Sequence, residues 1–167
     1  PCATAALTPP PDPASQAMMA HAMLSLPATK GFEIGSGFDG CTMRGSVHND
    51  PFVARPAAAG DGADAPAIMT SKNHAGGTLG GITSGADVYF RVAVKAVSTI
   101  GQAQPTSTFD GKQVVLEAKG RHDPCVLPRT PPLVEGMAAL VLADCALLQR
   151  TRLGGATTTV SDGASNF

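Results

Sequence analysis

Three side chains of different chemistry stand side by side in residues 120–125, whose sequence is GRHDPC. Arg121 carries a permanent planar cation that suits a phosphate or a carboxylate. His122 can gain or lose a proton near neutral pH, and Asp123 adds a carboxylate next to both. Gly120 permits a backbone conformation that a side chain would block. The segment is a candidate binding or acid–base site, although spacing alone supports a structural ion pair equally well.

A second candidate is the glycine-rich run at residues 75–85, which contains Gly80 among its five glycines. Glycines let the backbone approach a ligand or another segment closely. The run lacks the lysine-containing end of a P-loop and the glycine spacing of a dinucleotide-binding turn. The pattern alone therefore does not decide between a ligand contact and close packing.

The clearest strand pattern covers residues 87–95. Alternate positions on one face are apolar and suit a core, namely Val88, Phe90, Val92 and Val94. The opposite face carries Arg91 and Lys95, about 13 Å apart at ~3.3 Å per residue. These cations are consistent either with a solvated edge or with an anion contact. Lys95 also opens a loop over residues 96–99.

A metal-dependent hydrolase built from His74, His122 and Asp123 is the least supported alternative. No pair of these residues has a helical ligand spacing such as H-E-x-x-H. The polar triplet at residues 48–50 precedes a proline, which favours a turn over a ligand set. Metal ligation is therefore not predicted.

Four ordered segments resemble the chorismate synthase family. They are KGFEIGSGFDGCTMRGS at residues 30–46, SKNHAGGTLGGITSG at 71–85, FRVAVKAVSTI at 90–100, and GRHDPC followed by VLPRTPPLVEGMAALVLAD at 120–144. The resemblance covers nearly all of residues 14–150. Several long motifs in the family's order are far more specific than any single glycine-rich match.

The resemblance implies binding of reduced FMN and of 5-enolpyruvylshikimate 3-phosphate, which the family converts to chorismate by 1,4-elimination of phosphate. It implies that Asp123 is the catalytic base. It also implies a set of cofactor-binding residues: Pro27, Ala28, Gly80, Lys95, Ala96, Val97, Ser98, Thr99 and Arg121. NADPH is a possible reductant if the complete enzyme is bifunctional, and a homotetramer is the expected assembly.

The chain also departs from the family pattern. Chorismate synthases are much longer, and nothing here matches their N-terminal half, which carries two catalytic histidine motifs. Ala96 follows the loop lysine where a proline is common, and residues 51–70 form a longer insertion than bacterial members carry. We therefore expect a chain that lacks turnover alone. A non-catalytic flavin-binding or assembly fragment is the alternative.

Composition excludes several other classes. The formal net charge of −1 and the absence of Trp argue against a general nucleic-acid binder. No apolar run reaches the ~18–20 residues that cross a bilayer. The four cysteines show no C-x-x-C spacing, which suggests reduced thiols of an intracellular protein. We expect a cytoplasmic location, with a plastid as the alternative.

The expected fold class is α+β, with helices on a mostly antiparallel sheet, and the resemblance implies a β-α-β sandwich. Residues 1–13 are expected to be irregular, 51–70 a mobile insertion loop and 151–167 a flexible tail. A helix should start near Asp12 with a methionine stripe facing a core and end at Pro27. Strands are expected at 30–34, 41–44 and 114–118. A last helix should start at Thr130, buried on several sides.

Overall fold

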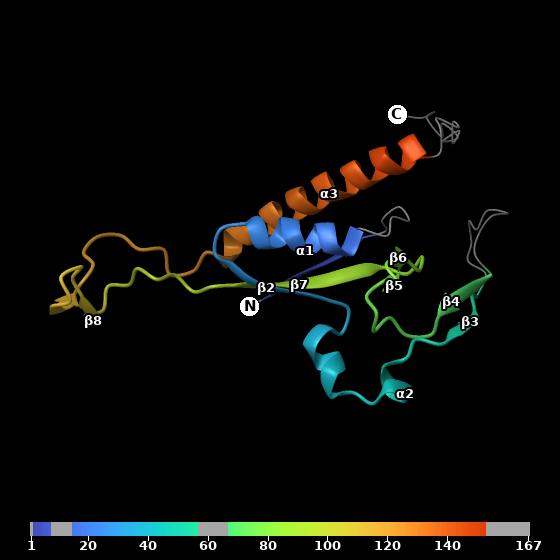
Figure 1. The fold of residues 1–167 in the computed structure, drawn as a ribbon, viewed down its shortest axis with the longest axis horizontal. Helices are drawn as coiled ribbons and strands as arrows, with labels where there is room; N and C mark the ends of the chain where they lie inside the picture. The colour runs from blue at the N-terminus through green and yellow to red at the C-terminus, as the bar shows by residue number, and fades with distance from the viewer. Residues whose placement is uncertain (1, 8–14, 57–66, 153–167) are drawn as a thin grey trace.

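A computed structural model describes residues 2–7, 15–56 and 67–152. Figure 1 shows two long helices lying together over one face of a small sheet, with shorter hairpins and turns extending from it. The elements in chain order are β1 (Cys2–Leu7), α1 (Ser15–Ser25), β2 (Thr29–Ile34), η1 (Gly37–Thr42), α2 (Gly45–His48), β3 (Phe52–Ala54), β4 (Ile68–Thr70), β5 (Thr78–Leu79), β6 (Ile82–Thr83), β7 (Val88–Val94), β8 (Gln104–Ser107), β9 (Gln113–Leu116), η2 (Leu127–Arg129) and α3 (Thr130–Arg152). The fold class is α+β, as the sequence predicts.

The central sheet has the order β1-β7-β2, and both neighbours pair antiparallel to β7. The predicted alternation is confirmed along β7, where Val88, Phe90 and Val92 are buried and the intervening residues are partly or fully exposed. Side chains that alternate between two faces are what a half-buried strand requires. The sheet therefore presents one apolar face, which α1 and α3 cover.

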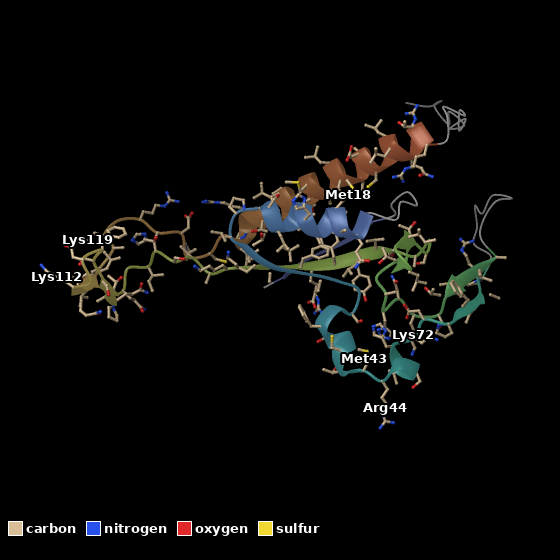
Figure 2. The ribbon with its side chains drawn as sticks, in the orientation of Figure 1. Met18, Met43, Arg44, Lys72, Lys112 and Lys119 are labelled. Carbon is tan, nitrogen blue, oxygen red and sulfur yellow. The ribbon has the colours of Figure 1, made fainter. Side chains whose placement is uncertain are left out.

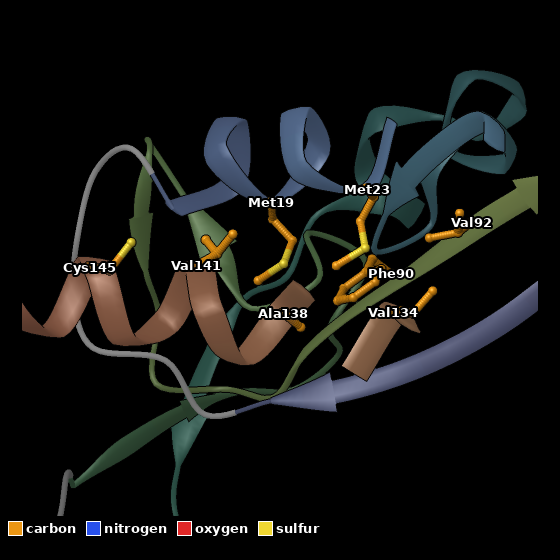
Figure 3. Packing of buried hydrophobic residues seen from close by; sticks show 8 residues of the cluster. All are labelled: Met19, Met23, Phe90, Val92, Val134, Ala138, Val141 and Cys145. Atoms are coloured by element: carbon orange, nitrogen blue, oxygen red, sulfur yellow. The ribbon is translucent and has the colours of Figure 1, made fainter. Parts of the chain in front are cut away.

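The core lies between this sheet face and the two helices (Figure 3). Phe90 and Met23 are fully buried, and the predicted methionine stripe of α1 packs inward as expected. Unbranched methionine side chains adapt to the gap between helix and sheet. The buried cluster consists of Met19, Met23, Phe90, Val92, Val134, Ala138, Val141 and Cys145.

The last helix differs from the sequence-based expectation. We predicted burial on several sides, but the buried residues of α3 form one stripe that packs on α1, while Leu140 is 67% exposed. Its exposed side carries further leucines, among them Leu133 and Leu147, together with charged residues, and is not covered by the residues that the structure describes. The amino-acid composition shows how apolar a helix is, but a helix face is buried only where a neighbouring element covers it.

By length and composition, Leu127–Arg152 is the one helical stretch among the described residues that could cross a membrane, with a mean hydropathy of 1.6 over its best window. Our expectation that no apolar run is long enough to cross a bilayer is therefore wrong by this measure, which allows a few charged residues within the apolar stretch. Only 22% of that window is buried in the structure. Most of this apolar window is therefore exposed among the described residues.

Three further expectations were wrong in part. The segment 41–44 is not a strand, because local i→i+3 hydrogen bonds close η1 and the following turn, among them Met43 N–H to the Gly40 carbonyl at 3.2 Å. Part of the N-terminal segment, expected to be irregular, forms β1 because β7 has a second edge to pair. The ends of the insertion pair as β3 and β4, and its residues 57–66 lie outside the described residues.

The strand predicted at 114–118 appears as β9, four residues at Gln113–Leu116, paired with β8. Residues 101–117 are all exposed, and Figure 2 shows Lys112 on this hairpin and Lys119 just after it, away from the helices. The predicted helix start at Thr130 is confirmed. Thr151 and Arg152 of the expected tail belong to α3, and residues 153–167 lie outside the described residues.

Candidate functional site

Two segments that the resemblance assigns to the cofactor meet at the end of β7. The Lys95 N–H donates to the Ala28 carbonyl at 2.7 Å, although 66 residues of chain separate them. Ala28 has a φ of 67°, which is uncommon for a residue with a Cβ. The turn that holds it is closed by Thr29, whose Oγ1 donates to the Leu26 carbonyl at 2.7 Å. Pro27 is exposed beside it.

The Lys95 loop follows directly from this junction. Lys95, Ala96, Ser98 and Thr99 are exposed, and Val97 is half-buried. One cation and two hydroxyls on a short exposed loop provide donors for a phosphate group. The loop therefore suits the phosphate of a flavin side chain, with its first residue fixed by the backbone bond to Ala28.

Asp123 lies between two arginines. Its Oδ2 accepts a hydrogen bond from Arg129 Nη1 at 2.9 Å, and its Oδ1 lies 4.0 Å from Arg121 Nη2. Arg121 is 90% exposed, whereas the Asp123 side chain is 36% exposed. The Arg129 contact orients the carboxylate, and the Arg121 guanidinium stays available to an external anion.

Our sequence analysis missed Arg129. Residues 127–129 form η2, whose tight turn brings Arg129 back to a carboxylate six residues earlier. The sequence shows Arg129 just before the prolines that begin the last helix, but an arginine in this position is common and does not indicate that Asp123 is its partner. His122 is held differently, with Nε2 3.3 Å from the Ala118 carbonyl oxygen. Gly120 has a φ of 117°, so the predicted need for glycine is met.

Gly80 lies elsewhere in the chain. It occupies the two-residue turn between β5 and β6 with a φ of 59°, and a Cβ built on it would meet nothing within 4 Å. This hairpin precedes β7, whereas Lys95 directly follows its last residue, and Figure 1 shows the β5–β6 hairpin at one end of β7 and the chain leading to β8 at the other. Seven strand residues span roughly 20 Å. The described residues therefore do not bring Gly80 to the other predicted contacts.

The first two glycines of the same run, Gly76 and Gly77, are required by close packing of the backbone. A Cβ on Gly76 would collide with the backbone of Gly35, and one on Gly77 would lie 2.6 Å from the Asp87 carbonyl oxygen. Asn73 clamps this part, since its Oδ1 accepts from Gly77 N–H and its Nδ2 donates to the Asp87 carbonyl, both at 2.7 Å. Close packing explains these glycines, and the open turn at Gly80 remains the candidate ligand contact.

A cluster of polar side chains contacts the start of the glycine-rich run at residues 75–85. The Asp50 carboxylate accepts the backbone N–H groups of His74 and Ala75 at 3.0 and 2.8 Å. The His74 ring stacks on His48 with centroids 5.4 Å apart, and His48 Nε2 lies 2.8 Å from Ser36 Oγ. His48 and Asp50 thus make contacts within the chain, although His48 ends the short helix α2 instead of lying in the predicted turn.

Burial is the main cause that raises the pKa of the Tyr89 phenol above its ordinary value of 10.0, and the nearby Asp50 carboxylate raises it further.

Among the described residues, no three His, Cys, Asp or Glu side chains gather as a metal site would need. A cavity of about 440 Å³ lies between residues 68–73 and 84–87, and it contains none of the predicted site residues. The described residues thus offer an exposed loop with one cation at Lys95 and a carboxylate, Asp123, oriented by Arg129.

Comparisons with known proteins agree on one family. A model of the chorismate synthase family matches residues 13–147. The chain is 54% identical to the chorismate synthase of Neurospora crassa over 149 residues, covering 82% of this chain and 34% of that protein. It is 53% identical to the Saccharomyces cerevisiae protein, covering 82% and 35%.

A relative from Methylacidiphilum infernorum is 55% identical over 135 residues. It covers 81% of this chain and 34% of its own length. A crystal structure of chorismate synthase superposes with a TM-score of 0.57 at 28% identity, over 81% of this chain and 30% of that one. The chain spans about a third of the length of the curated relatives it matches.

Proposed function

Since the chain belongs to the chorismate synthase family, we propose that it supplies the flavin-phosphate loop and the catalytic carboxylate of such an enzyme. The complete enzyme converts 5-enolpyruvylshikimate 3-phosphate to chorismate by 1,4-elimination of phosphate, with reduced FMN. The observation that carries this proposal is the backbone bond between Ala28 and Lys95, which joins two predicted cofactor segments that are distant in sequence.

The residues present fit a flavin mononucleotide. Its phosphate needs several donors and a cation, and the loop at Lys95 offers one ammonium group with the hydroxyls of Ser98 and Thr99. The backbone of Pro27 and Ala28 lies at the start of that loop and would border the same ligand. Ala96 and Val97 would contact it through the backbone. Bound reduced FMN supplies the electron-rich ring that assists departure of the phosphate.

Asp123 is the proton acceptor in this proposal. A general base must be held within hydrogen-bond reach of the proton that it removes. Arg129 fixes one carboxylate oxygen and leaves the second oxygen on the side of Arg121. Arg121, exposed and planar, would hold an anionic group of the flavin or substrate by paired N–H donors.

Gly80 requires a separate account. In the described residues it faces open space at the other end of β7, so a flavin contact there would involve residues outside the described ones or a second subunit. A homotetramer would provide such a subunit. We propose the homotetramer, a cytoplasmic or plastid location, and NADPH as the reductant if the complete enzyme is bifunctional. These proposals rest on the same family assignment.

A second candidate function is a non-catalytic flavin-binding or assembly fragment. The observation in its favour is length, because the chain spans about a third of its relatives. The family's two catalytic histidine motifs have no counterpart in the sequence. In this case the loop at Lys95 would bind flavin without turnover, and an anaerobic assay with reduced FMN and substrate distinguishes the two functions.

The decisive experiment uses a chimera in which the matched region of this chain replaces that of the Saccharomyces cerevisiae enzyme. Lys95→Ala should weaken FMN binding at least about tenfold, measured by equilibrium dialysis, because it removes the loop cation. Lys112→Ala removes the same charge from the exposed β8–β9 hairpin and should leave affinity unchanged. Equal affinities in the two variants would refute the proposed phosphate loop.

A further inference from the structure

The strand β2 contains a bulge in its first three residues. Thr29 lies opposite Val94 of β7. The next paired residue is Gly31, opposite Ala93, so Lys30 is the additional residue of a β-bulge. A Cβ built on Gly31 would lie 3.2 Å from the Ala93 Cβ, which shows that the two strands approach closely just after the bulge. Bulges redirect a side chain and are frequent beside functional sites, so the direction of Lys30 needs an explanation.

The bulge keeps the Lys30 side chain out of the core. Lys30 is two and four residues before Phe32 and Ile34, which both pack against the core cluster. In a regular strand its ammonium group would therefore point toward the helices, where an unpaired charge is costly. In the structure Lys30 is exposed, and Thr29 is buried in its place. The bulge thus places a cation at the surface of the sheet.

This cation lies beside the first residue of the proposed phosphate loop. The Lys95 N–H donates to the carbonyl of Ala28, which is two residues before Lys30. Directly paired residues of antiparallel strands have Cα atoms about 5 Å apart, and two strand residues span roughly 7 Å. The Cα atoms of Lys30 and Lys95 therefore lie within roughly 12 Å of each other. Two lysines with flexible four-carbon stems can bind one anion across that separation.

The charge of a flavin phosphate calls for a second cation at this loop. A phosphate monoester carries about −1.5 to −2 charges at pH 7, which is more than the single ammonium group of Lys95 neutralises. Within the described part of the chain, neither Lys30 nor Lys95 makes an ion pair. Glu33, the acidic residue of β2, is held by Arg91 at 2.8 Å. The two lysines are thus placed to share an external anion.

We propose that Lys30 is the second cation of the phosphate site at Lys95, directed to it by the bulge in β2. The two ammonium groups hold the phosphate of bound flavin mononucleotide from neighbouring strands, and Ser98 and Thr99 donate to it from the loop. The inference rests on the proposed function and adds a residue that the family resemblance did not assign to the cofactor.

The test measures the affinities of the chimera described above for FMN and for riboflavin, which is the same flavin without the phosphate. Lys30→Met removes the charge and keeps most of the side-chain length. It should weaken FMN binding at least about tenfold, the loss expected for one charge-assisted hydrogen bond, and leave riboflavin binding unchanged. Lys112→Met removes the same charge from the exposed β8–β9 hairpin and should change neither affinity.

Lys30→Arg is the conservative variant. It restores the cation, so its FMN affinity should return to within about threefold of the unsubstituted chimera. Equal losses for FMN and riboflavin in Lys30→Met would show that Lys30 only shapes the sheet, and this result overturns the proposal. The same holds if Lys30 pairs with an acidic residue of the complete enzyme, because the thermal midpoint would then fall without separating the two flavins.

Lys95→Ala in the same assay separates this inference from the proposed function. If Lys95→Ala weakens FMN binding and Lys30→Met does not, the second cation is refuted and the loop at Lys95 stands. If only Lys30→Met weakens FMN binding, with riboflavin unaffected, the phosphate lies at the bulge and the proposed loop is refuted. Unchanged FMN affinity in both variants overturns both proposals.

Discussion

Gly76 and Gly80 belong to the same glycine-rich run, yet the structure predicts different costs for replacing them. An alanine at Gly76 would adopt a φ of 66° and push its Cβ against the Gly35 backbone, with Gly35 Cα at 2.6 Å. Left-handed strain costs about 1–2 kcal/mol and overpacking about 1–3 kcal/mol, so Gly76→Ala should cost roughly 2–5 kcal/mol. A central value of about 3 kcal/mol corresponds to roughly 6–12 °C in thermal midpoint.

Gly80→Ala is the matched control. Its φ of 59° imposes the same strain, but nothing lies within 4 Å of its Cβ, so the cost should be only about 1–2 kcal/mol. Urea unfolding of both variants, compared by midpoint at constant slope, measures the difference. Equal costs would refute the assignment of Gly76 to close packing and Gly80 to an open turn. In the chimera, Gly80→Val should lower FMN affinity more than stability.

Two further outcomes follow from the titratable groups. In the chimera, Asp123→Asn should reduce single-turnover rate roughly 10²- to 10⁴-fold with little change in FMN affinity, whereas near-wild-type turnover would leave Asp123 only as a partner of Arg129. The raised pKa of Tyr89 contributes stability below pH ~10, which is lost as pH rises through the folded-state pKa. Tyr89→Phe should therefore flatten the loss of stability between pH 9 and 11 in urea unfolding, and an unchanged pH profile would contradict this.

The elements predicted best were those whose pattern and burial coincide. The strand around Val92 and the methionine stripe of α1 each bury one face and expose the other, so local periodicity was sufficient. Thr130 marked the start of α3 because proline in the first turn suits a helix start. In these cases the neighbour is supplied within the same chain.

The misses have a different origin. The apolar face around Leu140 was expected to be buried because periodicity records composition and not the presence of a neighbour. β1 has an alanine-rich sequence with weak strand preference, and only its pairing with β7 makes it a strand. Arg129 was missed because its contact with Asp123 depends on the turn of η2, which no spacing rule specifies.

The candidate site was predicted only in part. The resemblance assigned both Ala28 and Lys95 to the cofactor, and the structure joins these two residues by a backbone hydrogen bond. It grouped Gly80 with them, although this glycine lies beyond the opposite end of β7. A family motif records which residues serve a ligand in the complete assembly, but not which of them lie close together within one segment of it. Their roles toward flavin stay predictions.

The order β1-β7-β2 has a consequence for folding kinetics. β7 is the central strand, but both of its partners precede it, and Cys2 pairs with Ala93. Strand pairing so distant in sequence must close a long loop first, which slows folding. On the ribosome, β1 and β2 have no partner until residues 88–94 emerge. At a synthesis rate of ~5–20 residues per second, β1 and β2 remain unpaired for several seconds before β7 is available. Chaperones would act on the exposed strand edges during this delay.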